Sequence, residues 1–284
     1  MRTRVPGMIP RLARERPPGS AGTAGGGREP GDRHDGPAGR RRTRRAAVGM
    51  LAIAIAAAAG TASCTLTART GQAGGGALRP SGIPASIPAS LANLMALDSL
   101  PRTAAPGFTL TDQAGRTMAL RGFRGKVVVL EFMDPHCTDI CPIVSQEFVD
   151  AYHDLGPAAS KVVFAAVNVN PYFLSQRSVL AFSQEQRLTS IPGWHFFTGP
   201  LPALRRVWHG YNITVRAPSR NADVIHTSAI YFIGPGGRER YLASPEVDHT
   251  RDGTSYLPAG QLAEWGHGIA LLARSLARQP DSRA

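Results

Sequence analysis

Two cysteines separated by three residues carry the clearest chemistry in the sequence. Cys137 and Cys141 stand in the run Asp134-Pro-His-Cys-Thr-Asp-Ile-Cys-Pro142. On a regular helix, Cβ atoms four residues apart are about 5–6 Å from each other, whereas a disulfide needs them at about 3.5–4.5 Å. The segment must therefore leave regular helix geometry to close a disulfide, although the same two thiolates can hold one metal ion without closing so tightly. The pair is suited to switching between dithiol, disulfide and metal-bound forms.

The elements on either side of the pair favour reactive thiols. Residues 126–133 form a run suited to a buried strand, and Pro142 is tolerated only in the first turn of a helix, so the following helix begins close to Cys141. Backbone N–H groups at such a helix start stabilise a thiolate and lower the thiol pKa. A static disulfide is the structural alternative, favoured in an oxidising compartment. So small a loop contributes little stability, however, because that contribution grows with loop size.

The order of elements along the chain predicts an α/β fold of the thioredoxin type, a central mixed sheet flanked by helices with an N-terminal hairpin extension. The expected elements are a hairpin over 108–120, strands over 126–133, 161–169 and 194–197, helices over 142–155, 175–188 and 201–208, a hairpin over 224–242, and a closing helix over 257–277.

His226 is the candidate third ligand of a metal site. It opens the predicted central strand over 224–233, and in a thioredoxin-type fold that position lies beside the cysteine-bearing loop. Soft thiolates select Cu(I), and one imidazole completes a trigonal set. A structural zinc site would want four protein ligands, and only three are expected to meet here.

Other polar residues near the pair are interpreted more modestly. His136 is a candidate for tuning the Cys137 thiolate or for transient ligation, and Asp134 and Asp139 are interpreted as loop caps. The remaining histidines of the folded part are expected to be exposed or satisfied by neighbours: His153, His195, His209, His249 and His267.

Over roughly residues 105–277 the chain resembles the Sco/SenC proteins, extracytoplasmic thioredoxin-like copper proteins associated with assembly of the CuA centre of cytochrome c oxidase. The resemblance implies that Cys137, Cys141 and His226 hold one copper ion and that the two cysteines are also the redox pair. It further implies two partners, the CuA-bearing oxidase subunit and a copper or electron donor. The motifs that carry it are Gly125-Lys126-Val-Val-Val-Leu, His-Cys-x-x-x-Cys-Pro at 136–142, Trp194 before Thr198-Gly199, and His226-Thr-Ser with the stretch from Tyr231 to Gly237.

Two positions depart from the family pattern. Asn170-Pro171 stands where the family usually has Asp-Pro, and Ile225 stands where an acidic residue usually precedes the histidine. Two other functions remain open. One is a thiol–disulfide oxidoreductase without a metal-carrier role. The other is a peroxiredoxin-like peroxidase, in which a threonine typically stands three residues before the nucleophilic cysteine. Asp134 occupies that position here. This function is less favoured, because an acidic neighbour raises the pKa of a thiol instead of lowering it.

The excess of basic residues belongs to the start of the chain. The 284 residues carry a formal net charge of +12, and residues 1–45 contain twelve arginines against four acidic residues. The remaining residues hold 20 basic and 16 acidic side chains, so a nucleic-acid-binding face on the folded part is not supported.

The N-terminal part predicts export. Residues 1–39 are a Gly/Pro/Arg-rich disordered leader, and residues 40–64 combine an arginine run, an apolar stretch and small residues before Cys64. This resembles a bacterial lipoprotein signal with Cys64 as the acylated residue; an ordinarily cleaved signal and an uncleaved anchor are the alternatives. We expect residues 65–103 to be a flexible tether, with a short amphipathic helix over 90–100 against the domain edge, and residues 104–284 to be the folded domain. The protein is thereby predicted to be tethered to the outer face of the cytoplasmic membrane.

Overall fold

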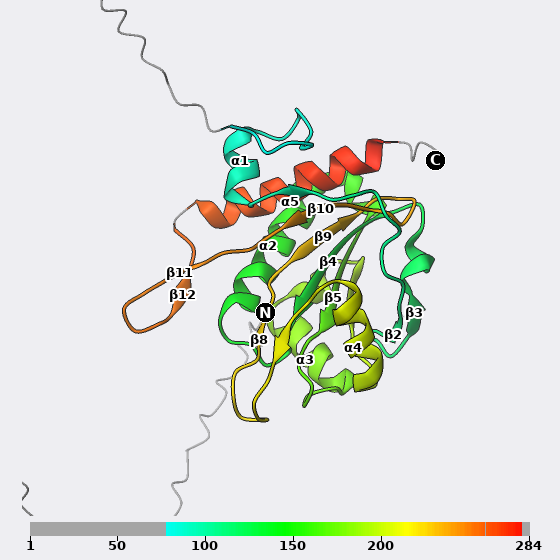
Figure 1. The fold of residues 1–284 in the computed structure, drawn as a ribbon, viewed down its shortest axis with the longest axis vertical. Helices are drawn as coiled ribbons and strands as arrows, with labels where there is room; N and C mark the ends of the chain where they lie inside the picture. The colour runs from blue at the N-terminus through cyan, green and yellow to red at the C-terminus, as the bar shows by residue number, and fades with distance from the viewer. Residues whose placement is uncertain (1–77, 259, 280–284) are drawn as a thin grey trace, which may run out of the picture. The chain divides into compact units, whose positions relative to one another are not determined.

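A six-stranded mixed sheet forms the centre of the domain (Figure 1). The computed structural model describes residues 78–258 and 260–279 of the chain. β4, β5 and β6 run parallel, while β9 is antiparallel to β4, β10 to β9 and β1 to β10. In spatial order the strands are β1 (Asp98–Ser99), β10 (Glu239–Ala243), β9 (Ile230–Ile233), β4 (Val127–Met133), β5 (Val162–Asn168) and β6 (Trp194–Phe197).

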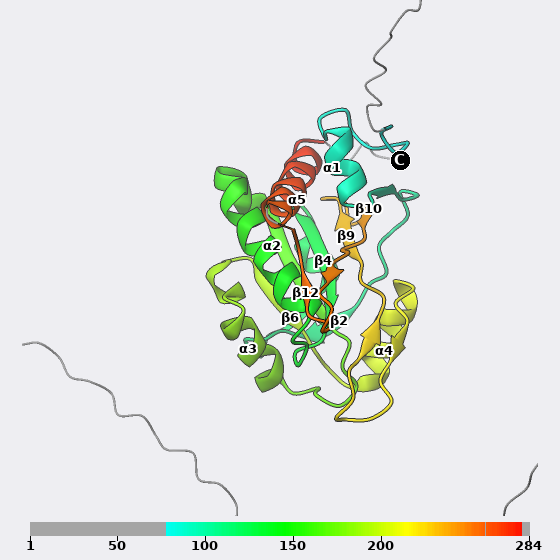
Figure 2. The same cartoon turned by 90° about the vertical axis from the view of Figure 1, so that its left-hand side faces the viewer.

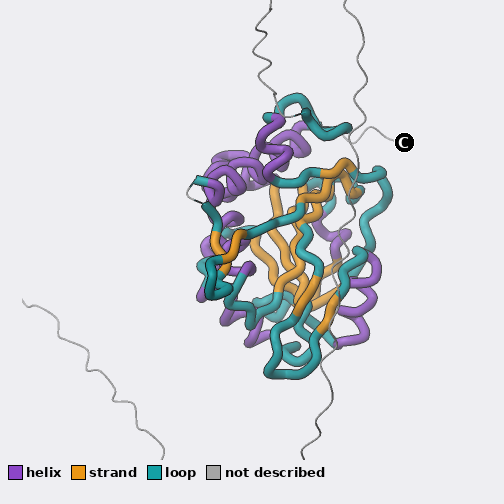
Figure 3. The backbone as a smooth tube through the Cα atoms, turned by 60° about the vertical axis from the view of Figure 1, so that its left-hand side comes forward, coloured by secondary structure: helices purple, strands orange, loops and turns teal. Residues whose placement is uncertain are grey.

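Helices cover both faces of this sheet (Figures 2 and 3). β4 and β5 are buried along their whole length, as expected for interior parallel strands, and their successive side chains enter two different cores. The core containing Val127 and Val129 packs against α1 (Ala89–Leu94), α2 (Ile140–Leu155), α3 (Gln176–Glu185) and α5 (Gln261–Arg278). The core containing Val128 and Leu130 packs against α4 (Leu201–Gly210) and the first hairpin. The thioredoxin-like architecture predicted from the sequence is confirmed.

Three two-stranded hairpins lie outside the central sheet. The predicted N-terminal hairpin is present as β2 (Thr109–Thr111) and β3 (Thr117–Ala119). The other two pair β7 (Val215–Arg216) with β8 (Ile225–His226), and β11 (Asp248–His249) with β12 (Ser255–Tyr256). The described residues also form short 3-10 helices at Leu120–Phe123, Gly156–Lys161 and Leu188–Ser190.

The single strand predicted over 224–233 is wrong. The chain divides it, so that Ile225–His226 pairs with Val215–Arg216 and the central strand β9 starts only at Ile230. The amide of Thr227 donates to the Thr214 carbonyl at 3.1 Å and so continues the small hairpin. The Thr227 hydroxyl accepts from the Thr214 amide, also at 3.1 Å. Pairing with the backbone of Val215–Arg216, which no local sequence pattern indicates, therefore takes these residues away from the central sheet.

The tether predicted over 65–103 is also wrong in its second half. Ile87, Met95 and Leu97 have exposed fractions of 0%, 0% and 1%, and Ile83 and Leu91 are buried with them against α5. The doubled Ile-Pro-Ala-Ser thus supplies two core isoleucines four residues apart. The predicted helix at the domain edge is confirmed as α1, but it ends at Leu94, and Asp98–Ser99 joins the sheet as an edge strand.

The leader, the signal and Cys64 lie outside the described residues. Among the helices of the described part of the chain, none combines the length and apolar character needed to cross a membrane.

Candidate functional site

The cysteine pair lies where β4 gives way to α2, as predicted. β4 ends at Met133, a loop follows, and α2 begins at Ile140, which places Cys141 and Pro142 in the first helical turn. Pro142 fits there because the first turn has no intrahelical acceptor for its missing N–H. Cys137 is half-buried on the loop, whereas Cys141 is 2% exposed.

The two thiols are free and lie next to each other, with the amide of Cys141 donating to the sulfur of Cys137 at 3.4 Å. The Cys141 thiol and backbone amides of Cys141 and Asp139 hydrogen-bond to the Cys137 sulfur and lower the pKa of Cys137 to about 7, against burial and the charge of Asp134. The same hydrogen bond, together with burial, raises the pKa of Cys141 well above its ordinary value. The proton that leaves the pair near neutral pH is therefore that of the accessible Cys137, while Cys141 remains a thiol.

A buried carboxyl lies behind Cys141. Glu131 is 2% exposed on β4, and burial raises its pKa to about 8. Its charge is one cause of the raised Cys141 pKa. On α2, burial and the charge of Glu131 raise the pKa of Glu147 as well. The sequence signal for Glu131 is its place as the one charged residue in the otherwise apolar run over 127–133.

The loop before Cys137 is anchored by Asp134, in agreement with its prediction as a loop cap. One carboxylate oxygen of Asp134 accepts from the His136 amide at 2.8 Å and from the Asn170 side chain at 2.9 Å. Its carbonyl accepts from the Cys137 amide at 3.1 Å. The Asn170 side-chain oxygen in turn accepts from the Tyr172 amide at 2.9 Å, which ties the cysteine loop to the loop after β5. The prediction of Asp139 as a cap is wrong, because its side chain makes no capping hydrogen bond.

His136 is directed toward a second aromatic group. Its ring stacks on Phe173 with centroids 3.6 Å apart, and the guanidinium of Arg220 lies over the same Phe173 ring at 4.3 Å. This His136–Phe173–Arg220 stack joins three separate loops at one edge of the site. Phe173 and Arg220 could not be predicted from the sequence, because nothing local marks two residues 47 positions apart as partners.

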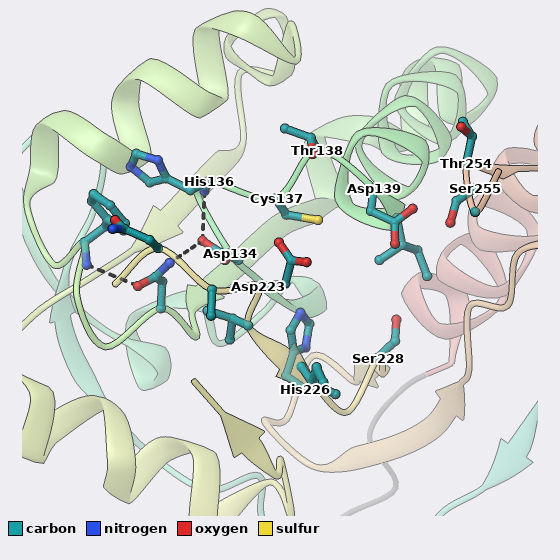
Figure 4. A pocket seen from close by; sticks show the side chains of 18 of the residues that line it. Asp134, His136, Cys137, Thr138, Asp139, Asp223, His226, Ser228, Thr254 and Ser255 are labelled. Carbon is teal, nitrogen blue, oxygen red and sulfur yellow. Dashed lines mark hydrogen bonds between the residues drawn. The ribbon is translucent and has the colours of Figure 1, made fainter. Parts of the chain in front are cut away.

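His226 lines the same cavity as Cys137, a space of about 820 Å³, and Figure 4 shows both side chains at its wall. One ring nitrogen, Nδ1, lies 3.0 Å from the Thr227 carbonyl, so we assign the proton to Nδ1 and leave the Nε2 lone pair free. Burial lowers the pKa of His226, against the Thr227 carbonyl and the charge of Asp134, so the ring is neutral at pH 7. A neutral imidazole is the form that ligates a metal.

The three predicted ligands are brought together only in pairs. Cys137 touches Cys141, and Cys137 shares its cavity with His226. Within residues 78–258 and 260–279, however, no three His, Cys, Asp or Glu side chains lie close enough to hold one metal ion. The arrangement as it stands is a dithiol with a neutral imidazole facing the same space.

The other histidines within the described residues are exposed or satisfied by neighbours, as predicted. His195 is 7% exposed with its Nδ1 3.1 Å from the Asp112 carboxylate, and His267 pairs with Asp154 at 2.7 Å. The remaining three are exposed: His153, His209 and His249.

The fold and the site together define a thioredoxin-like protein with a reactive dithiol at the carboxyl edge of its sheet. The family model described as SCO1/SenC matches residues 98–251, and the chain belongs to this family.

Three relatives illustrate the similarity. The SCO1 protein homolog of Bacillus subtilis (strain 168) is 26% identical over 133 residues, 46% of this chain and 68% of that protein. The mitochondrial SCO2 homolog of Bos taurus is 30% identical over 136 residues, again 46% of this chain but only half of the relative's length. The structure of ScoI from Bradyrhizobium japonicum with copper bound is 20% identical with a TM-score of 0.46, covering 60% of this chain and 99% of that one.

Proposed function

We propose that the protein is a copper carrier that binds one copper ion through Cys137, Cys141 and His226 and serves the CuA-bearing subunit of cytochrome c oxidase. It would deliver copper to that subunit, keep the subunit's cysteines reduced, or do both. Membership of the SCO1/SenC family supports this class of function. The observation that carries it for these residues is the Cys137 thiolate, held by the Cys141 amide, in one cavity with the neutral ring of His226.

The donor set fits Cu(I) by its chemistry. Two thiolates and one imidazole are soft or borderline donors, which select Cu(I) over the hard cations. Because no three donors lie within range of one ion in the described chain, binding requires a shift of the cysteine loop or of the segment around His226. That segment is held through β8, which pairs with β7 over only two residues on each strand. A short hairpin outside the central sheet can move at less cost than a sheet strand.

The test that separates a copper carrier from a plain dithiol oxidoreductase is the third ligand. We expect the reduced full chain to bind one equivalent of Cu(I) under anaerobic titration against a chromophoric chelator. His226→Ala should weaken that binding by about tenfold or more, since losing a residue that only hydrogen-bonds to a metal ligand already lowers metal affinity by about 10–100-fold.

The matched control is His209→Ala, which removes an exposed histidine from α4. It should leave affinity and stoichiometry unchanged. Unaltered Cu(I) affinity and spectrum in His226→Ala would remove His226 from the site and favour the oxidoreductase, in which the imidazole matters little.

We also propose that the domain works outside the cytoplasm, tethered to the outer face of the cytoplasmic membrane through an acylated Cys64. The arginine run, the apolar stretch and the small residues before Cys64 support this. The intact mass of the chain extracted from membranes tests it: a mass increase of diacylglycerol size at an N-terminal Cys64 is expected, and an unmodified Cys64 would contradict it.

A further inference from the structure

Cys137 lies on a ridge between two cavities. The first, of about 820 Å³, extends from the cysteine loop to the segment around His226 and the β11–β12 turn. The second, of about 520 Å³, extends from the same loop along α3. His136, Cys137 and Thr138 line both. Because the reactive sulfur has a cavity on each side, this surface can bind an extended polypeptide that runs from one cavity to the other across Cys137. A small-molecule site would instead enclose most of its ligand in one cavity.

The rim of the first cavity exposes large apolar side chains. Among the described residues, four large hydrophobic side chains are exposed; one of them lines this cavity and two more are sequence neighbours of its lining residues. Ile225 is 64% exposed and lines the cavity, while Tyr172 and Tyr256 directly adjoin the lining residues Phe173 and Ser255. Exposed aromatic and aliphatic groups gathered around a reactive group are typical of a protein–protein contact.

The first cavity carries negative charge. Asp139, Asp223 and Asp252 line it and are exposed, and Figure 4 shows Asp139 and Asp223 at its wall. The one basic side chain in its lining, Arg220, lies over the Phe173 ring. In the second cavity Arg177 and Glu185 balance each other. The charge asymmetry therefore lies on one side of Cys137 only.

We propose that this surface docks a cysteine-bearing segment of a partner protein that has basic residues beside the cysteine, with the basic side chains in the first cavity and the cysteine over Cys137. This rests on the proposed function, since it names the kind of partner that the dithiol serves. Charge complementarity of this kind raises the rate of association more than the final affinity.

The reaction at the docked segment balances as an ordinary thiol–disulfide exchange when the partner cysteine is part of a disulfide. The Cys137 thiolate attacks the partner sulfur, forms a mixed disulfide and expels the other sulfur as a thiolate. The Cys141 sulfur then attacks Cys137, releases the partner cysteine and passes its proton to it. The protein dithiol is oxidised to the Cys137–Cys141 disulfide by two electrons, and the partner disulfide is reduced to one thiolate, the first sulfur expelled, and one thiol, which carries the Cys141 proton.

The experiment uses short peptides with one central cysteine, each carried as a mixed disulfide with thionitrobenzoate. One peptide flanks the cysteine with lysines, one with glutamates and one with serines. The full chain, with Cys64→Ser to leave only the dithiol, is reduced and mixed with each peptide, and release of thionitrobenzoate is followed by absorbance. At low salt we expect the lysine peptide to react about tenfold faster than the glutamate peptide, and the ratio should approach one at high salt.

Asp223→Asn combined with Asp252→Asn should lower that ratio to about threefold or less, because it removes two of the three exposed carboxylates from the cavity. The matched control is Asp98→Asn with Glu264→Gln, which removes two exposed carboxylates from β1 and α5. It should keep the tenfold ratio. An unchanged ratio in the Asp223/Asp252 variant, or no charge preference in the parent chain, would overturn the docking proposal.

A Cu(I) titration of the same proteins separates this proposal from the one on which it rests. If the parent chain prefers the lysine peptide but does not bind Cu(I) tightly, the copper-carrier proposal is wrong and the docking proposal stands. If it binds Cu(I) tightly but shows no charge preference, the docking proposal is wrong and the copper-carrier proposal stands.

Discussion

Between pH 8 and pH 6 the apparent Cu(I) association constant of the reduced protein is expected to fall by about 10³-fold. Coordination needs both sulfurs as thiolates, so copper must displace every proton that the cysteines carry. Cys141 keeps its proton throughout this range because its pKa is raised, which costs tenfold in affinity for each pH unit. Cys137, with a pKa of about 7, begins to take up a second proton near neutrality. Below pH 7 the apparent association constant therefore falls by nearly a hundredfold for each pH unit.

His226 adds little to this fall, because its lowered pKa keeps the ring neutral until the acid end of the range. Cys141→Ser is the informative variant. With only Cys137 left to titrate, its already weakened affinity should fall by about tenfold over the same two pH units. The measurement is a competition titration against a chelator whose own protonation is known. If the apparent Cu(I) association constant of the parent chain falls by only tenfold or less for each pH unit below pH 7, one cysteine does not enter the copper site as a thiolate.

The part of this site that the sequence predicts is the part that is local in the chain. The apolar run over 126–133, the four-residue spacing of the cysteines and Pro142 fix a strand, a loop and a helix start within about fifteen residues. The structure confirms all three. Asp134 as a loop cap belongs to the same group, since its amide donor His136 is two residues away.

The part that the sequence does not predict depends on partners far along the chain. Asn170 meets Asp134 across 36 residues, and the Phe173–Arg220 contact has no local signature. Residues 224–233 have the composition of one β-strand, and only the backbone of Val215 and Arg216 explains why His226 leaves the central sheet. Likewise Ile83 and Ile87 look like tether residues until α5 is present to cover them.

Iodoacetamide at pH 7.5 is expected to alkylate Cys137 at least about 100-fold faster than Cys141. Only the thiolate reacts, and about three-quarters of Cys137 is ionised at this pH, given its pKa of about 7. The raised pKa of Cys141 leaves a few per cent of thiolate at most, and its 2% exposure slows access further. The measurement is peptide mapping by mass spectrometry after short exposure to isotopically labelled reagent, with Cys64→Ser in the chain so that only Cys137 and Cys141 can react.

The cause of the asymmetry can be tested by removing the hydrogen bond between the two thiols. Cys141→Ala deletes the S–H that stabilises the Cys137 thiolate, so the pKa of Cys137 should rise and its alkylation at pH 7 should slow by several-fold. Cys141→Ser is the matched control, because a hydroxyl can still donate to the thiolate and should preserve most of the rate. Equal rates for the parent chain, Cys141→Ala and Cys141→Ser would mean that backbone amides alone activate Cys137.

The order of reactivity decides how the protein can meet a partner. If Cys137 reacts first, the mixed disulfide forms on the ridge between the two cavities, where a polypeptide has room on both sides. Cys141, buried beneath and still carrying its proton, then resolves that intermediate from inside the protein. If Cys141 reacted first, the partner would have to enter the first turn of α2, where the structure offers it no space. The alkylation rates therefore test the direction of thiol exchange as well as the two pKa values.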